Sequence, residues 1–294
     1  MFFGVDVGGT KIQCALFNGK EVELTQKIST PSDYTTFLEK ITELFNQATE
    51  NKSGKVKSVG IGIPGRTDKH HIKWVPNIPY LNGQHLANDL SDRLKVDVLL
   101  ANDAQLALLG EVWMGAGKGK TNAVLMSLGT GIGGAIMVGG KIVRGSNSTA
   151  GAFGWINFDI NATTRLDQGL LERHASGTAL QKMGAQLNPP LTSYEVVKKA
   201  REEDPECLKI IMQIGEILGA SLATVTSILD PEIVIVSGGL VEAFDLLYSP
   251  IKEKMRTLAS PSVKDVDVVM SELGTHAGVY GAVRLAMLKN IAWI

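Results

Sequence analysis

The sequence predicts an α/β protein with two domains, and three observations lead to this class. Segments with the two-residue alternation of strands follow one another along the chain, interleaved with segments of helical spacing. A strand, a Gly–Thr turn and a second strand occur near residue 8 and again near residue 130. With 294 residues, the chain exceeds the usual size of one domain. We expect one domain over 1–112 together with a last helix at about 277–294, and a second domain over 113–276.

In the first half, apolar patterning and turn residues predict the elements. The chain opens with three strands, joined by a Gly-Gly-Thr-Lys turn and an Asn18-Gly19 hairpin signal. Ser32 and Asp33 offer helix caps before a segment whose apolar residues share one helical face. The predicted strands are Phe2–Val7, Ile12–Phe17, Glu21–Ile28, Val59–Ile63 and Val96–Leu100, and the predicted helices contain Phe37–Ala48, Leu86–Leu94 and Ala104–Trp113.

The second half repeats the opening pattern and then becomes mostly helical. Two strands flank a glycine-rich turn, and a Gly139-Gly140 hairpin leads to a third strand. Residues 121–140 carry no charge and have the length of a membrane-spanning helix, but their six glycines favour a buried strand pair instead. The predicted strands are Ala123–Leu128, Ala135–Val138, Lys141–Arg144, Ile233–Val236 and Val266–Met270, and the predicted helices are about Pro205–Leu229, Val241–Arg256 and Ala277–Leu288.

Charge and cysteine content narrow the range of functions. The 29 Lys and Arg residues nearly balance the 30 Asp and Glu residues, which disfavours nucleic acid as a partner because such binding depends on clustered cations. Two cysteines, Cys14 and Cys207, cannot form a disulfide framework or a four-thiolate zinc site. The start has no positively charged region, so no secretory signal is predicted. We expect a cytoplasmic protein with a small-molecule partner and no membrane contact.

Two glycine-rich turns are candidate phosphate-binding sites. Residues without a Cβ let backbone N–H groups converge on phosphate oxygens, and a threonine in each turn adds a hydroxyl donor. Two such turns, one on each domain, predict a phosphate clamp across a cleft. The alternative for each is a tight hairpin that binds no ligand. The residues concerned are Gly8, Gly9, Thr10 and Lys11 in the first turn and Gly129, Thr130, Gly131 and Gly133 in the second.

Two carboxylates are the candidates for chemistry. Asp6, just before the first turn, is placed to hold a Mg²⁺ ion carried by phosphates, because this cation prefers carboxylate and phosphate oxygens; the alternative is a carboxylate that caps the turn. Asp103 follows a strand and can accept the proton of a substrate hydroxyl that attacks a γ-phosphate, with Asn102 orienting the substrate. The alternative is that Asp103 only caps the helix that begins at Ala104.

A set of motifs occurs in a fixed order along nearly the whole chain. The motifs are Asp6-Val-Gly-Gly-Thr-Lys11, Gly62-Ile-Pro-Gly65, Pro76-Asn-Ile-Pro79, Ala101-Asn-Asp-Ala104 with Gly110-Glu111, Leu128-Gly-Thr-Gly-Ile-Gly-Gly134 and Ser237-Gly-Gly239. This set resembles the ROK family of sugar kinases. The stretch from Tyr80-Leu-Asn-Gly-Gln84 through Asn88-Asp-Leu-Ser-Asp-Arg-Leu94 is similar to the fructokinase, mannokinase and N-acetylglucosamine kinase branch of that family.

The resemblance implies an actin-like ATPase (ribonuclease H-like) fold with two α/β domains around a central cleft. It implies transfer of the ATP γ-phosphate to a hexose hydroxyl, usually the 6-hydroxyl, with Mg²⁺, by a protein that commonly forms a homodimer. Asp103 would be the general base, and the two glycine turns with Gly238 and Gly239 would surround the nucleotide. The implied sugar contacts are Gly65, Asn77, Asn102, Asp103 and Glu172.

The chain departs from the family pattern where the family binds zinc. The family's Glu and His of Ala-Gly-Glu-x-Gly-His are replaced by Ala152 and Trp155, and its cysteine positions hold Thr163, Arg165 and Leu170. No zinc site is therefore predicted. Either apolar packing by residues such as Trp155, Ile156 and Phe158 orders this loop, or the loop is looser.

Three functions remain open at this point. The leading hypothesis is an ATP:hexose phosphotransferase for fructose, mannose, glucose, an N-acetylated hexosamine or a bulkier glycoside. The second is a non-catalytic sugar or nucleotide sensor, suggested by the missing Glu and His. A third is an actin-like ATPase that hydrolyses ATP without sugar. For Glu172 the alternative to sugar binding is a solvated helix charge, and His174 is expected to be packed or exposed rather than a ligand.

Overall fold

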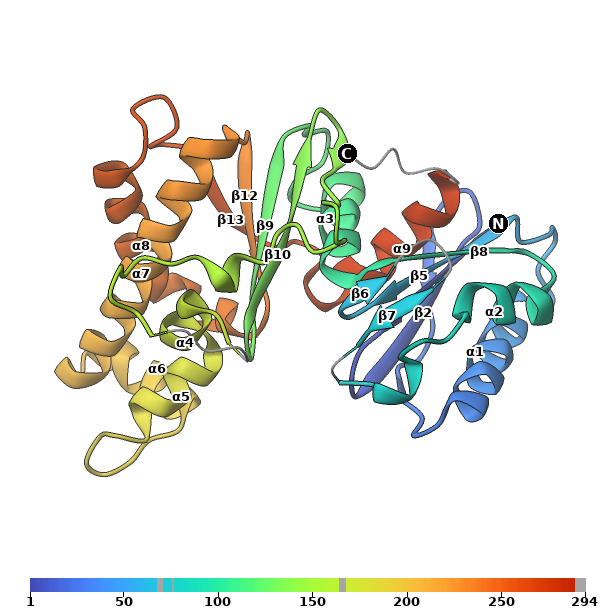
Figure 1. Cartoon of the computed structure of the whole chain (residues 1–294), viewed down its shortest axis with the longest axis horizontal. Coiled ribbons are helices and arrows are strands. Elements are labelled where there is room, and N and C mark those ends of the chain that lie inside the picture. The colour runs from blue at the N-terminus through green and yellow to red at the C-terminus, as the bar shows by residue number, and fades with distance from the viewer. Residues whose placement is uncertain (68–70, 76, 164–167, 289–294) are drawn as a thin grey trace. The chain divides into compact units, whose positions relative to one another are not determined.

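The computed structural model of the chain describes residues 1–67, 71–75, 77–163 and 168–288 (Figure 1). The chain forms two compact units. The first unit contains Met1–Gly119, Gly139–Ala150 and Glu272–Ile294, and the second contains Lys120–Val138 and Gly151–Ser271. Each unit has its own sheet and its own hydrophobic core.

The first unit is built on a mixed sheet in which the order of the main strands is β3-β2-β1-β5-β8, with β4 also paired to β2. The first two strands form an antiparallel hairpin, and β1, β5 and β8 run parallel. A separate small hairpin, β6–β7, follows β5. The strands are β1 (Phe2–Val7), β2 (Lys11–Phe17), β3 (Val22–Leu24), β4 (Ile28–Ser29), β5 (Ser58–Ile63), β6 (Arg66–Thr67), β7 (Ile72–Trp74) and β8 (Asp97–Asn102), with β11 (Lys141–Ile142) in the segment 139–150.

Helices cover both faces of this sheet because the strands are apolar on both sides (Figure 1). Phe3, Val5 and Val7 of β1 pack with buried residues of α1 (Tyr34–Thr49) and α2 (Leu86–Leu94). On the opposite face, α9 (Ala277–Leu288) packs against β1 and β5 and against α3 (Asp103–Met114). The alternation of side chains along β1 therefore directs Asp6 to the face covered by α9.

Close backbone approach fixes α9 on the sheet. A Cβ on Gly60 of β5 would lie 2.1 Å from the carbonyl oxygen of Ala282, and one on Gly281 would lie 1.7 Å from that of Leu106 in α3. Such distances leave room only for hydrogen at these positions. The C-terminal helix can therefore reach both the sheet and α3 only with glycine at these contacts.

Glu111 joins the end of α3 to the segment that leads into α9. Its side chain is fully buried, Oε2 accepts a hydrogen bond from the N–H of Ala116 (2.8 Å), and Oε1 accepts one from the N–H of Leu273 (3.0 Å). A buried carboxylate needs such partners, because an unpaired one would be costly. The Gly110-Glu111 motif thus has a structural role in the first unit.

The second unit has a sheet of order β10-β9-β12-β13, in which β9 and β10 form an antiparallel hairpin and β9, β12 and β13 are parallel. Five helices pack with this sheet into one core. The strands are β9 (Ala123–Leu128), β10 (Ile132–Val138), β12 (Ile233–Ser237) and β13 (Asp267–Met270), and the helices are α4 (Leu170–Ala175), α5 (Gly177–Gly184), α6 (Ser193–Arg201), α7 (Pro205–Leu229) and α8 (Phe244–Leu258).

Among the described residues, α7 alone has the length and hydropathy of a membrane-spanning helix. Asp204 caps its first turn by accepting from the N–H groups of Glu206 and Cys207, and Pro205 stands at its first position, where a proline costs nothing. Leu218 and Leu222 are among the α7 residues buried in the core of the second unit. Its apolar composition is therefore explained by burial.

The structure confirms most of the predicted elements and corrects two. Residues 121–140 contain the hairpin β9–β10, as the glycines predict. The single strand expected over Glu21–Ile28 is instead two short strands, because the hydroxyl of Thr25 accepts the N–H of Cys14 (3.1 Å) and interrupts the ladder. The strand expected over Lys141–Arg144 ends at Ile142.

Replacing Gly60 by alanine is expected to destabilise the protein by about 2 to 3 kcal/mol, because the new Cβ overlaps the backbone of α9. Chemical denaturation followed by circular dichroism measures this change. Gly239→Ala is the matched control, since a Cβ there has no neighbour within 4 Å. A Gly60→Ala protein as stable as the control would contradict the packing of α9 on the sheet.

Candidate functional site

The first glycine turn is an exposed hairpin whose backbone is held from within the first unit. The N–H of Gly8 donates to the carbonyl of Lys11 (2.9 Å), and the hydroxyl of Thr30 donates to the carbonyl of Gly8 (2.7 Å). A Cβ on Gly9 would lie 3.1 Å from the Cβ of Asn77. The turn therefore lies beside Asn77, and its residues Gly9, Thr10 and Lys11 are open to solvent.

Asp6 is a half-buried carboxylate at the end of β1. A Cβ on Gly278, in the first turn of α9, would lie 2.8 Å from both of its carboxylate oxygens. Burial is the main cause that raises the pKa of Asp6 to about 7; the charge of Asp103 raises it further, and Lys27 opposes both. A cation at this carboxylate would favour the ionised form. Asp6 lies just before the turn, as predicted, and its role as a ligand of Mg²⁺ stays a prediction.

Asp103 occupies the first position of α3, directly after β8. The alternative role of Asp103, as the cap of this helix, does not hold: Asn102 is the cap, and its Oδ1 accepts from the N–H of Gln105 (3.2 Å). Asn102 can do so because it has the extended backbone of a cap residue. The carboxylate of Asp103 accepts from the N–H of Ala104 (2.8 Å), and burial raises its pKa.

Asp6 and Asp103 lie close together on the face of the sheet that α9 covers. Gly62 of β5 stands between them, since a Cβ there would lie 3.3 Å from Oδ1 of Asp6 and 3.8 Å from the Cα of Asp103. The side-chain amide of Asn102 also donates to the carbonyl of Gly65 (3.0 Å). The structure thus brings five predicted residues of the first unit into one neighbourhood: Asp6, Gly65, Asn77, Asn102 and Asp103 lie on adjoining strand ends and loops.

The second glycine turn, in the second unit, is held by the helices that follow it. The N–H of Gly177 donates to the carbonyl of Gly129 (2.8 Å), and the hydroxyl of Thr178 donates to the carbonyl of Thr130 (2.7 Å). A Cβ on Gly177 would lie 2.9 Å from that carbonyl oxygen of Gly129. The turn therefore lies against the N-terminus of α5.

Glu172 contacts the same turn. Its Oε2 accepts from the N–H of Ile132 (2.8 Å), and a Cβ on Gly131 would lie 2.3 Å from this oxygen. Glu172 is half-buried, so it is not simply a solvated helix charge. No local sequence pattern predicts this contact, because it joins residues 40 positions apart.

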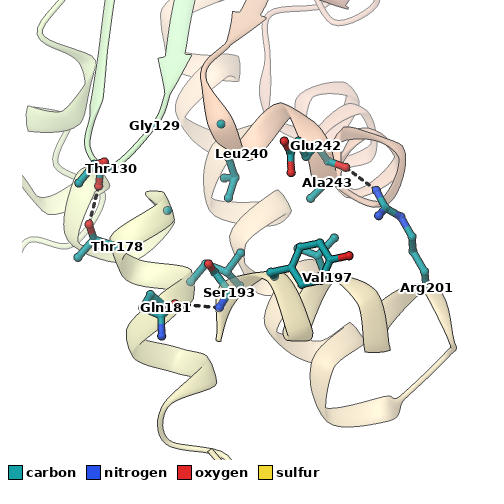
Figure 2. A pocket seen from close by; sticks show the side chains of 14 residues that line it. Gly129, Thr130, Thr178, Gln181, Ser193, Val197, Arg201, Leu240, Glu242 and Ala243 are labelled. Atoms are coloured by element: carbon teal, nitrogen blue, oxygen red, sulfur yellow. Dashed lines mark hydrogen bonds between the residues drawn. The ribbon is translucent and has the colours of Figure 1, made fainter. Parts of the chain in front are cut away.

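A cavity of about 620 Å³ opens beside the second turn (Figure 2). The turn, α5 and α6, and the short helix Gly239–Ala243 line it from different directions. Its volume lies in the range of small-molecule sites. Its wall combines apolar side chains with hydroxyl, amide and carboxylate groups: Leu180, Val197, Leu240 and Ala243 are apolar, and Thr130, Thr178, Gln181, Ser193 and Glu242 are polar.

Three predicted residues line this cavity, namely Gly129, Thr130 and Gly239. Gly238 instead supports it: its φ is +92°, and a Cβ would lie 2.4 Å from the carbonyl of Leu128, so only glycine fits. Sequence reasoning missed the residues of α5 and α6. Val197, for example, has the spacing of an ordinary core residue, and only the tertiary structure shows that it faces a cavity.

The loop at the position of the family's zinc motif is joined to α4 by a backbone hydrogen bond. Trp155 and Phe158 are 57% and 44% exposed, so neither ring is buried in the core, although Phe158 contacts the ring of His174. Ile156 alone of the three packs against the core, and its carbonyl accepts from the N–H of Leu171 (3.2 Å). Arg165 lies outside the described residues.

His174 is packed rather than free. Its ring meets the edge of Phe158 at 5.6 Å between centroids. Among the described residues, no group of three or more His, Cys, Asp or Glu side chains has the arrangement of a metal site.

A solved structure defines the class of this fold. The ROK family glucokinase from Streptomyces griseus, in complex with glucose and AMPPNP, matches with a TM-score of 0.77 and 28% identity, over 98% of this chain and 99% of that one. The chain therefore has the actin-like ATPase fold with α/β units. The ROK family model matches residues 2–289, so the chain belongs to the ROK family.

Curated relatives align over nearly their full length. The chain is 32% identical to the glucokinase of Halalkalibacterium halodurans, over 95% of this chain and 93% of the relative. It is 29% identical to the N-acetylgalactosamine kinase of Shewanella sp., over 97% and 96% respectively. These relatives are sugar kinases.

The raised pKa of Asp6 leads to a test without any ligand. Asp6 is ionised in the unfolded chain above pH 4, whereas in the folded protein its pKa is about 7, so folding becomes less favourable as the pH rises from about 4 to 7. Asp6→Asn removes this cost and is expected to raise Tm at pH 8 by about 3 to 6 °C, but much less at pH 5.

Thermal unfolding at both pH values, with a chelator present, measures this difference. The matched control is Asp92→Asn, an exposed carboxylate on α2, which should shift Tm little at either pH. An equal Tm change for Asp6→Asn at pH 5 and pH 8 would contradict the raised pKa.

Proposed function

We propose that this chain transfers the γ-phosphoryl group of ATP to a hydroxyl of a hexose, specifically the 6-hydroxyl. Its curated relatives act on glucose and on N-acetylgalactosamine, and both are hexoses. The S. griseus structure holds glucose together with an ATP analogue. Support therefore comes from relatives that match the chain along its whole length.

The position and the raised pKa of Asp103 are the observations that support the proposed reaction. Asp103 follows a strand directly, next to Asn102, and burial raises its pKa. A base is most effective when its pKa lies near the working pH, and the raised pKa moves this carboxylate in that direction. In the proposed reaction Asp103 accepts the hydroxyl proton, the sugar oxygen bonds to the γ-phosphorus, and ADP leaves.

The sugar is proposed to contact the loop and strand ends around Asp103. Asn102 is fixed by its bonds to Gln105 and Gly65, which leaves little freedom to the peptide at Gly65. Asn77, beside the first glycine turn, supplies an amide. Glu172 uses one carboxylate oxygen for the N–H of Ile132, and the other is proposed to accept a sugar hydroxyl.

ATP is proposed to use both glycine turns. The apolar wall of the cavity, with Leu240 and Val197, suits an adenine ring, and Thr130 offers a hydroxyl at its turn. Gly8, Gly9, Thr10 and Lys11 of the first turn, Gly131 and Gly133 of the second, and Gly238 with Gly239 complete the proposed nucleotide contacts.

The residues of the first unit fit a Mg²⁺ ion carried by ATP. Asp6 offers hard oxygen ligands, and Lys27 opposes the effects of burial and of Asp103 that raise its pKa. The ion would neutralise charge on the phosphates. Asp6 would hold it, directly or through water, while Asp103 remains the acceptor of the proton.

The other proposed properties follow from the sequence and the family. We propose a cytoplasmic enzyme that uses no zinc and binds neither nucleic acid nor membrane, and that forms a homodimer. The two buried cysteines, Cys14 and Cys207, support the cytoplasmic location, and the balanced charge supports the absence of nucleic-acid binding.

A coupled assay of ADP release, with and without hexoses, tests the function directly. ADP release that depends on a hexose supports the kinase. Release without any sugar favours a general ATPase, and binding without release favours a sensor.

Asp103→Asn is expected to lower kcat at least 1,000-fold, because the amide cannot accept the proton, while ATP binding stays within about twofold. The same ADP assay gives kcat, and thermal shift with AMPPNP reports nucleotide binding. Asp92→Asn serves as the control for charge removal on the surface. Near-normal turnover by Asp103→Asn would remove this residue from the mechanism.

Val197→Trp is expected to fill the cavity of the second unit and raise KM for ATP about 10-fold or more, with a smaller effect on KM for the sugar. The reason is steric, since the new ring takes the volume proposed for adenine. Val138→Trp, an exposed position on β10, is the control. An unchanged KM for ATP would place the nucleotide elsewhere.

A further inference from the structure

Lys27 lies on the segment that runs alongside the first glycine turn. It directly precedes β4, which pairs with β2. Thr30, just after β4, donates from its N–H to the carbonyl of Thr10 (3.0 Å) and from its hydroxyl to the carbonyl of Gly8 (2.7 Å). The segment from Lys27 to Thr30 is therefore held by hydrogen bonds to the turn that is proposed to bind phosphate.

The side chain of Lys27 is directed to the face of the sheet that carries Asp6. Ile28, the next residue, packs against the core under α1 and α2, so the alternation of a strand turns Lys27 to the other face. Its Nζ donates to the hydroxyl of Thr275 (3.2 Å), just before α9. In the first turn of α9, a Cβ on Gly278 would lie 2.8 Å from both carboxylate oxygens of Asp6. Lys27 and Asp6 thus meet neighbouring parts of one segment.

Lys27 is a cation that a ligand can reach. Its side chain is exposed, and no carboxylate of the described residues forms an ion pair with it. Its charge acts on two titratable groups nearby. It lowers the pKa of Asp6, against the larger effect of burial, and burial together with this charge holds the pKa of His276 below its usual value. His276 is therefore uncharged at neutral pH, whereas Lys27 supplies positive charge beside Asp6.

Four side chains follow one another across the sheet on the face that α9 covers. Asp103 follows β8, Asp6 ends β1, and Gln13 stands opposite Asp6 in the register of β1 and β2. The buried Gln13 is held by His276, whose Nδ1 lies 2.9 Å from its Oε1. Lys27 comes last, because β4 pairs with the edge of β2 that faces away from β1. It therefore lies on the side of Asp6 that is remote from Asp103.

This order matches the order of the groups in phosphoryl transfer. The attacking oxygen, the γ-phosphorus and the leaving oxygen lie roughly in line. With the sugar hydroxyl at Asp103 and the phosphates at Asp6 and the first glycine turn, as proposed, the leaving ADP extends toward Lys27. A fixed cation at that end stabilises the charge that grows on the leaving phosphate.

We infer that the ammonium of Lys27 binds the β-phosphate of ATP and stabilises the charge that this phosphate gains as ADP leaves. The inference rests on the proposed kinase activity and adds a residue to its phosphate site. The sugar oxygen bonds to the γ-phosphorus, the bond from that phosphorus to the β–γ bridging oxygen breaks, and the electron pair stays on the bridging oxygen. Asp103 takes the hydroxyl proton, and Lys27 keeps its own protons.

The test combines kinetics at pH 7 and pH 9 with calorimetric titration of ADP and of AMP. The kinetics use Mg²⁺, ATP and whichever of glucose, mannose, fructose or N-acetylglucosamine gives the fastest ADP release. Wild type is compared with Lys27→Met, which keeps the length of the side chain but removes its charge, and with Lys27→Arg, which keeps the charge. Lys20→Met, at an exposed position beyond the other end of β2, is the matched control, and thermal unfolding checks that each variant is folded.

Lys27→Met is expected to lower kcat about 10- to 100-fold at both pH values, with Lys27→Arg in between, because the charge on the leaving phosphate loses its partner. The KM for the hexose should stay within about twofold. The same variant should weaken ADP binding about 10-fold and leave the binding of AMP, which has no β-phosphate, within about twofold. Lys20→Met should match wild type in all of these measurements.

Two results would overturn the inference while the kinase stands. One is a loss of kcat at pH 7 that disappears at pH 9, because Lys27 would then act only by favouring the ionised form of Asp6. The other is an affinity for ADP that Lys27→Met leaves unchanged. If no hexose stimulates ADP release by the wild-type protein, the proposed function itself fails, and this inference fails with it.

Discussion

The carboxylates of Asp6 and Asp103 lie close together in a poorly solvated part of the first unit, and strands and helices of that unit surround them. Asp6 ends β1 and Asp103 follows β8, and the strand between them presents only Gly62. Burial disfavours the charged form of both groups and raises the pKa of each, and the charge of Asp103 raises the pKa of Asp6 further. In the proposed reaction the same two groups hold a cation and accept a proton at neighbouring points.

The sequence predicts the parts of the fold that depend on local patterns. The limits of α7 follow from Asp204 and Pro205 at one end and from the end of its apolar run at the other, and the hairpin β9–β10 follows from its glycines. Prediction fails where a single side chain alters the backbone pairing. Thr25 does this by bonding to Cys14, and nothing in the local sequence distinguishes it from an ordinary strand threonine.

The candidate site likewise has some features that local sequence predicts and others that depend on tertiary packing. Turns and strand ends were predictable because glycine and acidic residues there have few other uses, and Asp6 and Asp103 do lie together. The contact of Glu172 with Ile132 and the cavity wall at Val197 depend on tertiary packing alone. For the loop at the family's zinc motif, the sequence left open whether apolar packing orders it, and Trp155 and Phe158 lie largely at the surface.

Because α9 follows the strands that it covers in the sequence, it determines when the environment of Asp6 forms during synthesis. This helix covers one face of the sheet formed by β1, β5 and β8, yet the ribosome adds it long after those strands. Until then Gly4 and Gly60 face water, and Asp6 lacks the turn of helix that desolvates it. A nascent or truncated chain therefore holds an ordinary solvated aspartate at this position, and the acid with the unusual proton affinity comes into existence only when synthesis of α9 is complete.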